Sequence, residues 1–418
     1  MNKSGKRILL LLAVICVFLF AEAYADSTDT LAIRGRHYPV TNSFMNLSGI
    51  GEDDIGRFET LAPQMTNLKE IDLGSEDVSP VSWEIISRIQ AAVPDARIRY
   101  SFSLYGEPVT LDTEYIDLRK ISVDDNGKAV MAALKCMKKC TYLDMDCSGV
   151  DDEHMAVIRD AFPDVKVVWR VKFGKLDYSV RTDVKTILAS LTGEGGWLGI
   201  TNEASAVPLT YCTDVINLDL GHSSQMRTTS FLRYMPNLEV FITYENYLPD
   251  ISDLVYCKKL KYLELFGSSM TDVSPIAELE NLTDLMLCAC YKVTDISPLI
   301  PSDVLPNLKR LYIAGTSSHV PAEQIEAFIA NHPDCEVNTT ENSVGTHWRF
   351  IDLGIGNSEE NRVPAYREIC NIFHYRNPEK DQSSYSFSRN DPYYTTPHGQ
   401  PVEGKQLEWF YGDNHFEG

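Results

Sequence analysis

The sequence predicts an α/β solenoid, a stack of short repeats with a curved parallel sheet on its concave face and helices and turns on its convex face. An apolar triplet recurs after 22 residues, first as Leu260, Leu263 and Leu265 and then as Leu282, Leu285 and Leu287. A turn with the sequence Asp-Val-Ser-Pro at 272–275 recurs as Asp-Ile-Ser-Pro at 295–298. A unit of this size cannot bury its own apolar strand, so it is stable only when it stacks on its neighbours.

A second, longer repeat predicts the helices of the convex face. It ends in Pro-Asp and occurs three times, at 81–95, 150–164 and 320–334. Each copy has a glutamate ten residues before its proline and apolar residues eight and five residues before it. Apolar residues three apart form one face of a helix, the helix dipole favours a glutamate in the first turn, and Pro-Asp ends the helix. We therefore expect three helices that pack an apolar face on the sheet.

The strands should follow the L-x-x-L-x-L pattern and, in the first half, also the residues beyond each proline. We expect strands at 68–73, 97–104, 113–118, 140–145, 166–173, 182–188, 215–220, 238–243, 260–265, 282–287, 308–313 and 335–337. About a dozen parallel strands, spaced by roughly 4.8 Å, would then form one curved sheet about 55 Å long.

The two ends of the chain differ from the repeats. Residues 1–25 combine a basic start, an apolar run and an Ala-Tyr-Ala site, a pattern typical of a cleaved secretory signal peptide. Cys16 lies inside the apolar run, where a lipoprotein anchor does not fit. Residues 26–60 should form an N-terminal cap that shields the first repeat. Residues 61–340 should form the solenoid, and 341–418 an aromatic-rich C-terminal cap or tail.

Charge and cysteine content narrow the classes of ligand. Without residues 1–25 the chain keeps 35 basic and 58 acidic residues, a net charge of −23. So acidic a protein is not expected to bind nucleic acid, and no membrane span remains once the signal is removed. Nine cysteines remain, without zinc-finger spacing, and neither a metal nor a cofactor is expected. Cys290 follows the last leucine of its repeat by three residues and should bond the backbone of a neighbouring repeat.

The pattern L-x-x-L-x-L with an Asp-Val/Ile-Ser-Pro turn resembles the leucine-rich repeats of secreted bacterial proteins of the internalin type. The resemblance covers 61–337 and is clearest at 215–313. It implies a leucine-rich-repeat solenoid that is secreted, with retention at the cell surface as an alternative. It also implies a protein that binds a partner through its concave face. The sequence has neither H-E-x-x-H nor G-x-S-x-G, so we do not expect an enzyme.

The leucines of each strand should point into the core, so the residues between them should line the concave face. This alternation predicts an acidic row flanked by a tyrosine row. The expected ligand-binding residues are Asp72, Tyr115, Asp117, Tyr142, Asp144, Asp219, Tyr262, Glu264 and Tyr312. One interpretation is that these positions are polar because they face water. The other is that they contact a protein partner, with a basic protein or a hydroxyl-rich ligand as open alternatives.

The tail offers an alternative function. It holds 13 aromatic residues in 78, against 10% for the whole chain. These rings could stack on sugars and make the protein a glycan-binding module. The competing interpretation, which we favour, is that the tail buries them against the last repeat. Residues 364–374 should form a short amphipathic helix with proline in its first turn.

Overall fold

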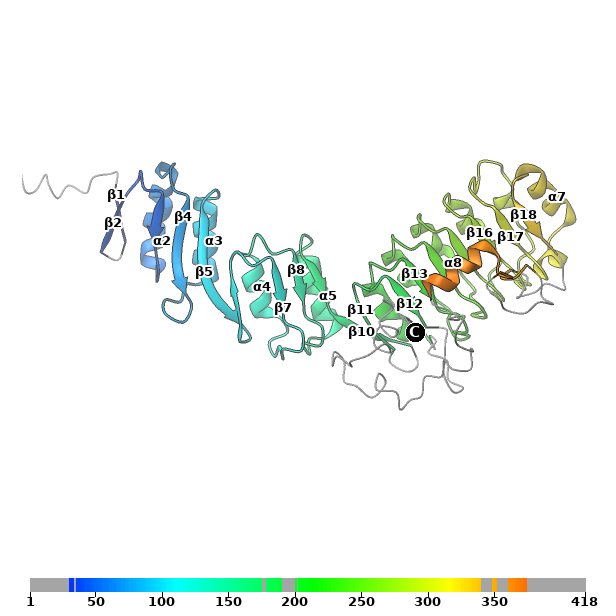
Figure 1. The fold of residues 1–418 in the computed structure, drawn as a ribbon, viewed down its shortest axis with the longest axis horizontal. Helices are drawn as coiled ribbons and strands as arrows, with labels where there is room; N and C mark the ends of the chain where they lie inside the picture. Colours follow the sequence, from blue (N-terminus) through cyan, green and yellow to red (C-terminus); the bar gives the residue numbers. More distant parts are fainter. Residues whose placement is uncertain are drawn as a thin grey trace, which may run out of the picture. The chain divides into compact units, whose positions relative to one another are not determined.

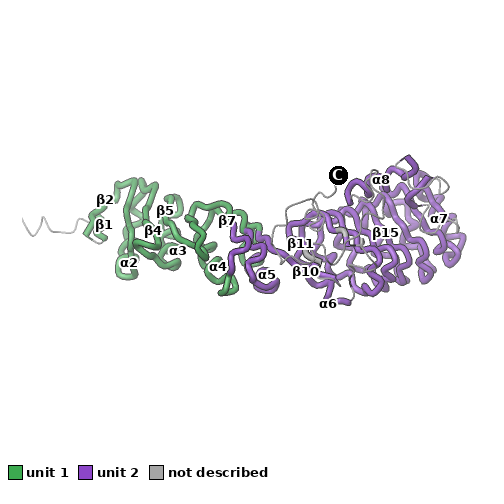
Figure 2. The backbone as a smooth tube through the Cα atoms, turned by 60° about the horizontal axis from the view of Figure 1, so that its bottom comes forward, with its two compact units in different colours: residues 1–116, 123–143, 160–166 green, residues 117–122, 144–159, 167–418 purple. Residues whose placement is uncertain are grey.

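The computed structural model describes residues 30–33, 35–174, 178–189, 200, 202–339, 348–351 and 360–373. The expected signal peptide and Cys16 lie outside these residues. The chain forms two compact units, and each is described here by itself (Figure 2). Unit 1 comprises residues 1–116, 123–143 and 160–166, and unit 2 comprises 117–122, 144–159 and 167–418.

Unit 1 begins with an antiparallel hairpin, followed by a four-stranded sheet with the order β3-β4-β5-β6. These strands are β1 (Thr30–Ile33), β2 (Arg36–Pro39), β3 (Phe44–Asn46), β4 (Glu70–Ser75), β5 (Arg97–Leu104) and β6 (Glu107–Thr110). The helices of this part are α2 (Glu52–Leu61), the 3₁₀ helix η1 (Ala62–Gln64) and α3 (Trp83–Ala92). Helix α3 is the first helix expected from the Pro-Asp repeat, and it buries Ile86 and Ile89. Strand β3 pairs in parallel with β4, so the repeat sheet starts within the segment that we expect to be a cap.

The chain next forms a three-stranded sheet with the order β7-β8-β9 and two helices. These elements are β7 (Tyr115–Asp117), α4 (Lys128–Leu134), β8 (Tyr142–Asp144), α5 (Asp152–Ala161) and β9 (Lys166–Val168). Helix α5 is the second helix expected from the Pro-Asp repeat. It has Glu153 in its first turn and buries Met155 and Ile158, as the pattern predicts.

Unit 2 contains a seven-stranded sheet with the order β12-β13-β14-β15-β16-β17-β18, in which every neighbouring pair is parallel (Figure 1). Before it lies the hairpin of β10 (Arg170–Phe173) and β11 (Tyr178–Arg181). The strands of the sheet are β12 (Thr186–Leu188), β13 (Asn217–Asp219), β14 (Val240–Ile242), β15 (Tyr262–Glu264), β16 (Asp284–Met286), β17 (Arg310–Tyr312) and β18 (Glu336–Asn338).

Short helical turns connect these strands on the convex side. They are α6 (Glu203–Ala206), η2 (Val207–Tyr211), η3 (Ser230–Tyr234), η4 (Ser252–Tyr256), η5 (Ser274–Glu278), η6 (Ser297–Leu299), η7 (Thr316–His319) and α7 (Ala322–Asn331). Both Asp-Val/Ile-Ser-Pro turns lead into 3₁₀ helices, with Pro275 or Pro298 in the first turn. Helix α7 is the third helix expected from the Pro-Asp repeat, and it buries Phe328.

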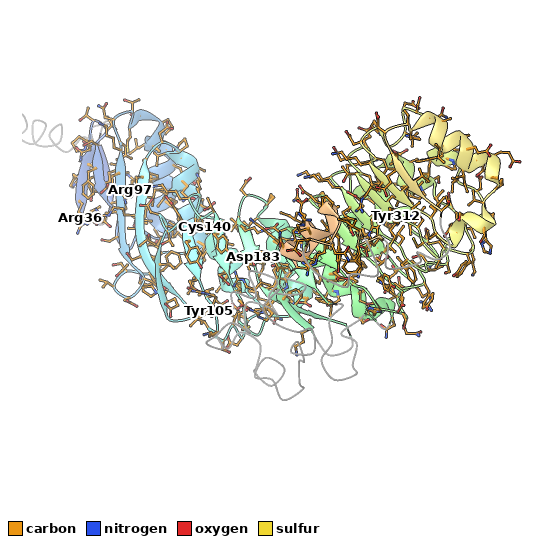
Figure 3. The ribbon with its side chains drawn as sticks, turned by 45° about the vertical axis from the view of Figure 1, so that its right-hand side comes forward. Arg36, Arg97, Tyr105, Cys140, Asp183 and Tyr312 are labelled. Carbon is orange, nitrogen blue, oxygen red and sulfur yellow. The ribbon has the colours of Figure 1, made fainter. Side chains whose placement is uncertain are left out.

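The prediction of one continuous parallel sheet is wrong, because antiparallel hairpins interrupt the stack. Strand β5 turns back through Tyr105 and Gly106, whose φ angles are 54° and 93°. Two successive left-handed residues form the turn that matches the twist of a two-stranded hairpin, so β6 runs antiparallel to β5. Tyr105 lies at the tip of this hairpin (Figure 3). After the second Pro-Asp repeat, β10 and β11 also pair antiparallel.

Polar side chains bond the backbone of neighbouring repeats inside unit 2. The Sγ of Cys290 donates to the carbonyl of Leu265 at 3.0 Å, which confirms the structural role expected for this cysteine. At equivalent positions Asn246 Nδ2 donates to the carbonyl of Leu220 at 2.9 Å, and Thr316 Oγ1 donates to that of Leu287. These bonds satisfy carbonyls that lie among the buried leucines.

The C-terminal part of the described chain ends in helix α8 (Pro364–Ile372), which confirms the expected amphipathic helix. Its buried residues are Tyr366, Ile369 and Cys370, three and four positions apart on one face. Figures 1 and 3 both place α8 over the seven-stranded sheet. Among the helices that the structure describes, none is both long and apolar enough to cross a membrane.

Candidate recognition surface

The pairing register brings the predicted concave residues of unit 2 into rows. Asp219 lies opposite Ile242, which lies opposite Glu264. The row continues through Met286 to Tyr312, as the repeat alignment predicts. A second row, two residues earlier in each strand, contains Asn217, Val240, Tyr262, Asp284 and Arg310. Three apolar residues, Val240, Ile242 and Met286, therefore interrupt the polar rows.

Burial divides the nine predicted ligand-binding residues into two groups. Five of them are buried: Asp144, Asp219, Tyr262, Glu264 and Tyr312. The expectation that these positions face water is wrong for this group, although their polarity fits the strand alternation. Asp72 and Tyr142 are half-buried, while Tyr115 and Asp117 are exposed.

The cover over Tyr262 and Glu264 is the chain's own segment Trp348–Ile351. The indole Nε1 of Trp348 donates to Tyr262 Oη at 2.7 Å and to Glu264 Oε1 at 2.6 Å. The Nη2 of Arg349 donates to Glu264 Oε2 at 2.7 Å. The hydroxyl of Tyr262 also hydrogen-bonds to Glu264. Glu264, with 0% of its surface exposed, is thus a carboxylate held by three donors.

Aromatic rings and a second arginine complete this cluster. The guanidinium of Arg310 lies 4.4 Å from the indole centroid of Trp348, and its Nε donates to Asp284 at 2.6 Å. The ring of Tyr312 meets the indole edge to face, with centroids 4.9 Å apart. The guanidinium of Arg349 lies 5.2 Å from the ring of Tyr244 and 5.0 Å from that of Tyr366. Such contacts stabilise a cation against an aromatic face.

The ionisation of the cluster follows from its burial. Burial raises the pKa of Tyr262 well above its ordinary value, and the negative charge of Glu264 raises it further. Burial alone would lower the pKa of Arg349, but the attraction of Glu264 outweighs it and raises that pKa. The tyrosine is therefore neutral and the arginine charged at neutral pH, and Tyr262 can act as a donor to Glu264.

A β-bridge joins the covering segment to the residues that precede helix α8. Phe350 pairs with Arg362, and the backbone N–H of Val363 donates to the carbonyl of Arg349 at 3.1 Å. The tail was expected to bury its rings against the last repeat. Trp348 instead contacts β15 and β17, so the described part of the tail lies across the face of the sheet.

A second buried cluster surrounds Asp144 at the end of β8. Arg181 Nη2 donates to Asp144 at 3.0 Å and also bonds Asp183 at 3.0 Å. Arg170 makes a two-bond contact with Asp146, at 2.9 and 2.7 Å. Burial raises the pKa of Asp144, and the bond from Arg181 opposes that effect. Burial would also raise the pKa of Asp146, but the charge of Arg170 outweighs it and lowers that pKa.

The remaining predicted residues are accessible. The rings of Tyr115 and Tyr142 stack with centroids 5.0 Å apart and planes 18° apart, and Tyr115 is 48% exposed. Asp117 forms an ion pair with Arg119 at 2.6 Å, which lowers the pKa of Asp117. Asp72 lies 3.7 Å from Arg99. Asp72, Asp117, Asp144 and Glu264 therefore each lie within reach of an arginine.

Sequence reasoning missed the arginines that pair with the acidic row. Arg119 stands two residues beyond Asp117, a spacing that could have indicated their contact. Arg349 lies 85 residues beyond Glu264, and no sequence spacing links the two. In the part of the chain that the structure describes, no group of three or more His, Cys, Asp or Glu side chains could hold a metal ion.

Comparison with known proteins found no matching family model and no matching curated protein. Solved structures similar to the chain include an internalin, InlF, from Listeria monocytogenes, with 16% identity and a TM-score of 0.32, covering 69% of this chain. A leucine-rich-repeat protein of Leptospira interrogans has 13% identity and a TM-score of 0.27, with 71% of this chain and 77% of that protein covered. Internalin C2 of Listeria monocytogenes has 18% identity and a TM-score of 0.22, with 34% and 77% covered.

The match spans 64% of the length of the first of these internalins. The repeat architecture is visible in the chain's own geometry, in the in-register parallel strands of unit 2, the inward leucines and the helical turns on the other side. The chain is an α/β leucine-rich-repeat solenoid.

Proposed function

We propose that the protein is a secreted, non-enzymatic recognition protein that binds a protein partner through the open part of its concave face. The observation that carries this proposal is the stacked pair Tyr115 and Tyr142. Two rings in parallel contact offer a rigid apolar surface, and their hydroxyl groups can hydrogen-bond to a partner. Tyrosines of this kind are enriched among the residues that contribute most to protein–protein affinity.

Charge should contribute little to this contact. Asp117 is paired with Arg119, and Asp72 lies near Arg99, so the acidic residues on the open face are largely neutralised. Exposed ion pairs are weak and are screened by salt. A partner bound mainly through aromatic contacts should keep its affinity between low and physiological salt, whereas a basic partner held by the acidic row would lose it.

The experiment compares three forms of the chain from Asp26 to Gly418 in affinity capture, followed by binding measurements with the purified partner. The test variant carries Tyr115→Ala and Tyr142→Ala. The matched control carries Tyr234→Ala and Tyr256→Ala, which remove two tyrosines that are 49% and 50% exposed at the ends of η3 and η4. We expect the test variant to bind at least about 30-fold more weakly, which corresponds to the threshold of about 2 kcal/mol for an energetic hot spot, and the control to bind as the parent does. Equal loss in both variants, or none in the test variant, would exclude this surface.

The glycan-binding alternative depends on the tail. Trp348, Tyr366 and Phe373 are buried, so their faces are not offered to a sugar. The other tail aromatics, apart from the half-buried Phe350, lie outside the described residues. Binding to immobilised glycans that survives the Tyr115 and Tyr142 substitutions would favour this alternative.

A further inference from the structure

The covered part of the concave face has the construction of a binding site. Its walls come from strands β15 and β17 and from the second residue after β14: Tyr244, Tyr262, Glu264, Arg310 and Tyr312. The two occupying side chains, Trp348 and Arg349, are neighbours in the sequence. Both Trp348 and Arg349 donate to Glu264. Each also takes part in a cation–π contact: the indole of Trp348 with Arg310, and the guanidinium of Arg349 with Tyr244.

The contacts are specific to the chemistry of the occupant. An indole N–H reaches two acceptors, Tyr262 and Glu264, and the backbone carbonyl of Trp348 accepts from Arg310 Nη1 at 3.2 Å. A guanidinium group reaches the second oxygen of Glu264 and lies near the ring of Tyr244. The site therefore favours an occupant that places an aromatic N–H donor next to a cation, and the negative charge of Glu264 complements that cation.

The site does not depend on its occupant for its framework. Leu263 and Leu265 flank Glu264 in the sequence and point into the repeat core, where they are completely buried. The strands carrying the site are held by parallel pairing with their neighbours. Removal of the Trp348 and Arg349 side chains should therefore leave the repeat core in place and expose the cluster to water.

The occupant also fits the site incompletely. Within the described part of the chain, Arg310 Nη2 and Arg349 Nε are buried and have no acceptor. A buried donor without a partner destabilises the state that contains it. Arg349 Nε leaves the site together with the built-in segment, whereas Arg310 Nη2 stays in its wall, so a ligand that supplied an acceptor to Arg310 would compete well with that segment.

We propose that Trp348 and Arg349, in the segment Trp348–Ile351, form a displaceable built-in ligand, and that the site beneath them binds an external protein segment with an aromatic residue next to an arginine. While the built-in segment is bound, its covalent attachment gives it a high effective concentration at the site. Tethering of this kind can make the apparent affinity of a segment about 100-fold or more higher than the affinity of the same segment when it is free. The partner site in unit 2 is thus closed until a stronger or more concentrated segment displaces the tail. This inference concerns a different part of the face from the Tyr115 and Tyr142 pair and stands independently of it.

The test uses a fluorescent synthetic peptide with the sequence of residues 348–373 and full chains that differ at the site. In the emptied variant, Trp348→Ala and Arg349→Ala are combined. We expect the peptide to bind this variant about 100-fold more tightly than it binds the parent, because the tethered competitor is gone. Adding Glu264→Ala to the emptied variant should abolish the gain, and a peptide lacking the tryptophan and arginine should not bind.

Circular dichroism and light scattering accompany each measurement. If the emptied variant folds and binds the peptide no better than the parent, the tail is a structural cover and the proposal fails. If the emptied variant does not fold, the Arg349→Lys variant is measured in its place. Lysine keeps the positive charge but loses the planar guanidinium that lies near the rings of Tyr244 and Tyr366. We expect that variant to bind the peptide several-fold better than the parent does, and equal binding would overturn the proposal.

A dimer of the parent that exchanges tails would assign the site to a second copy of the chain. Unchanged peptide binding in the Tyr115 and Tyr142 variant separates this result from the open-face proposal.

Discussion

The indole of Trp348 donates to the carboxylate of Glu264 at 2.6 Å, although the two residues are 84 positions apart in the sequence. Glu264 stands at a strand position that points away from the repeat core, so nothing within its own repeat buries it. The tail removes it from water and supplies a counter-charge through Arg349. The burial of this carboxylate and its ion pair therefore depend on the tail.

Glu264→Ala should destabilise the protein by about 3 kcal/mol, because removal of one partner of a buried ion pair leaves the other without compensation. In this pair the side chain of Glu264 is completely buried, and that of Arg349 is 21% exposed. The measurement is urea denaturation at pH 7. Glu239→Ala is the matched control, because Glu239 forms an exposed ion pair with Lys261 at 2.8 Å in the preceding repeat. The control should change the stability by less than about 1 kcal/mol. Equal effects would mean that burial by the tail does not matter.

Asp146→Asn should remove a pH-dependent part of the stability of unit 2. The folded state holds the pKa of Asp146 below its ordinary value near 3.8, because Arg170 outweighs burial. Such a group contributes stability that is present above its unfolded pKa and is lost as the pH falls through the folded pKa. Denaturation is measured from pH 7 to pH 2.5. At pH 7 the parent should be about 3 kcal/mol more stable than the Asp146→Asn variant, and this difference between the two proteins should shrink below about pH 4. Asp164→Asn, at an exposed turn, should stay within about 0.5 kcal/mol of the parent. A constant difference across the range would contradict the argument.

Asn246→Ala should destabilise unit 2 by about 2–3 kcal/mol. The side chain is fully buried, accepts from the backbone N–H of Ser223 at 2.6 Å and donates to the carbonyl of Leu220 at 2.9 Å. Without it, two buried backbone groups lose their partner, and each unsatisfied group is costly. Asn281→Ala provides the comparison, because Asn281 makes one exposed bond to the carbonyl of Lys258. Water can replace that bond, so thermal unfolding of this variant should match the parent. A similar loss in both variants would contradict a special role of the buried ladder.

Ala289→Gly should stabilise the protein by up to about 1 kcal/mol. A left-handed residue stands at this place in successive repeats, with φ angles of 62° at His222, 60° at Glu245, 71° at Gly267, 56° at Ala289 and 77° at Gly315. A residue with a Cβ is strained in this conformation, and glycine relieves the strain at some cost in chain entropy. Ala314→Gly is the control, because Ala314 is buried and has no left-handed backbone. It should lower the melting temperature. A decrease for Ala289→Gly would show that the methyl group packs more favourably than the strain costs.

Much of the solenoid could be predicted because its forces are local. Strand alternation and a fixed repeat length specify which residues point inward, and the register from Asp219 to Tyr312 follows from them. The helices before Pro94, Pro163 and Pro333 also follow from local spacing. The break in the sheet at Tyr105 and Gly106 could have been read from a two-residue turn, but the strand pattern alone did not distinguish a hairpin from a continuing stack.

By itself, the sequence determined the repeat fold, the inward leucines, the structural role of Cys290 and the polar character of the concave rows. The tertiary structure alone decided which of those polar residues meet water. Tyr115 is open, whereas Glu264 and Tyr262 lie beneath Trp348 and Arg349. The physical reason is that polarity at a strand position records only the direction in which a side chain points. What lies in that direction depends on a segment far along the chain, and no periodicity connects the two.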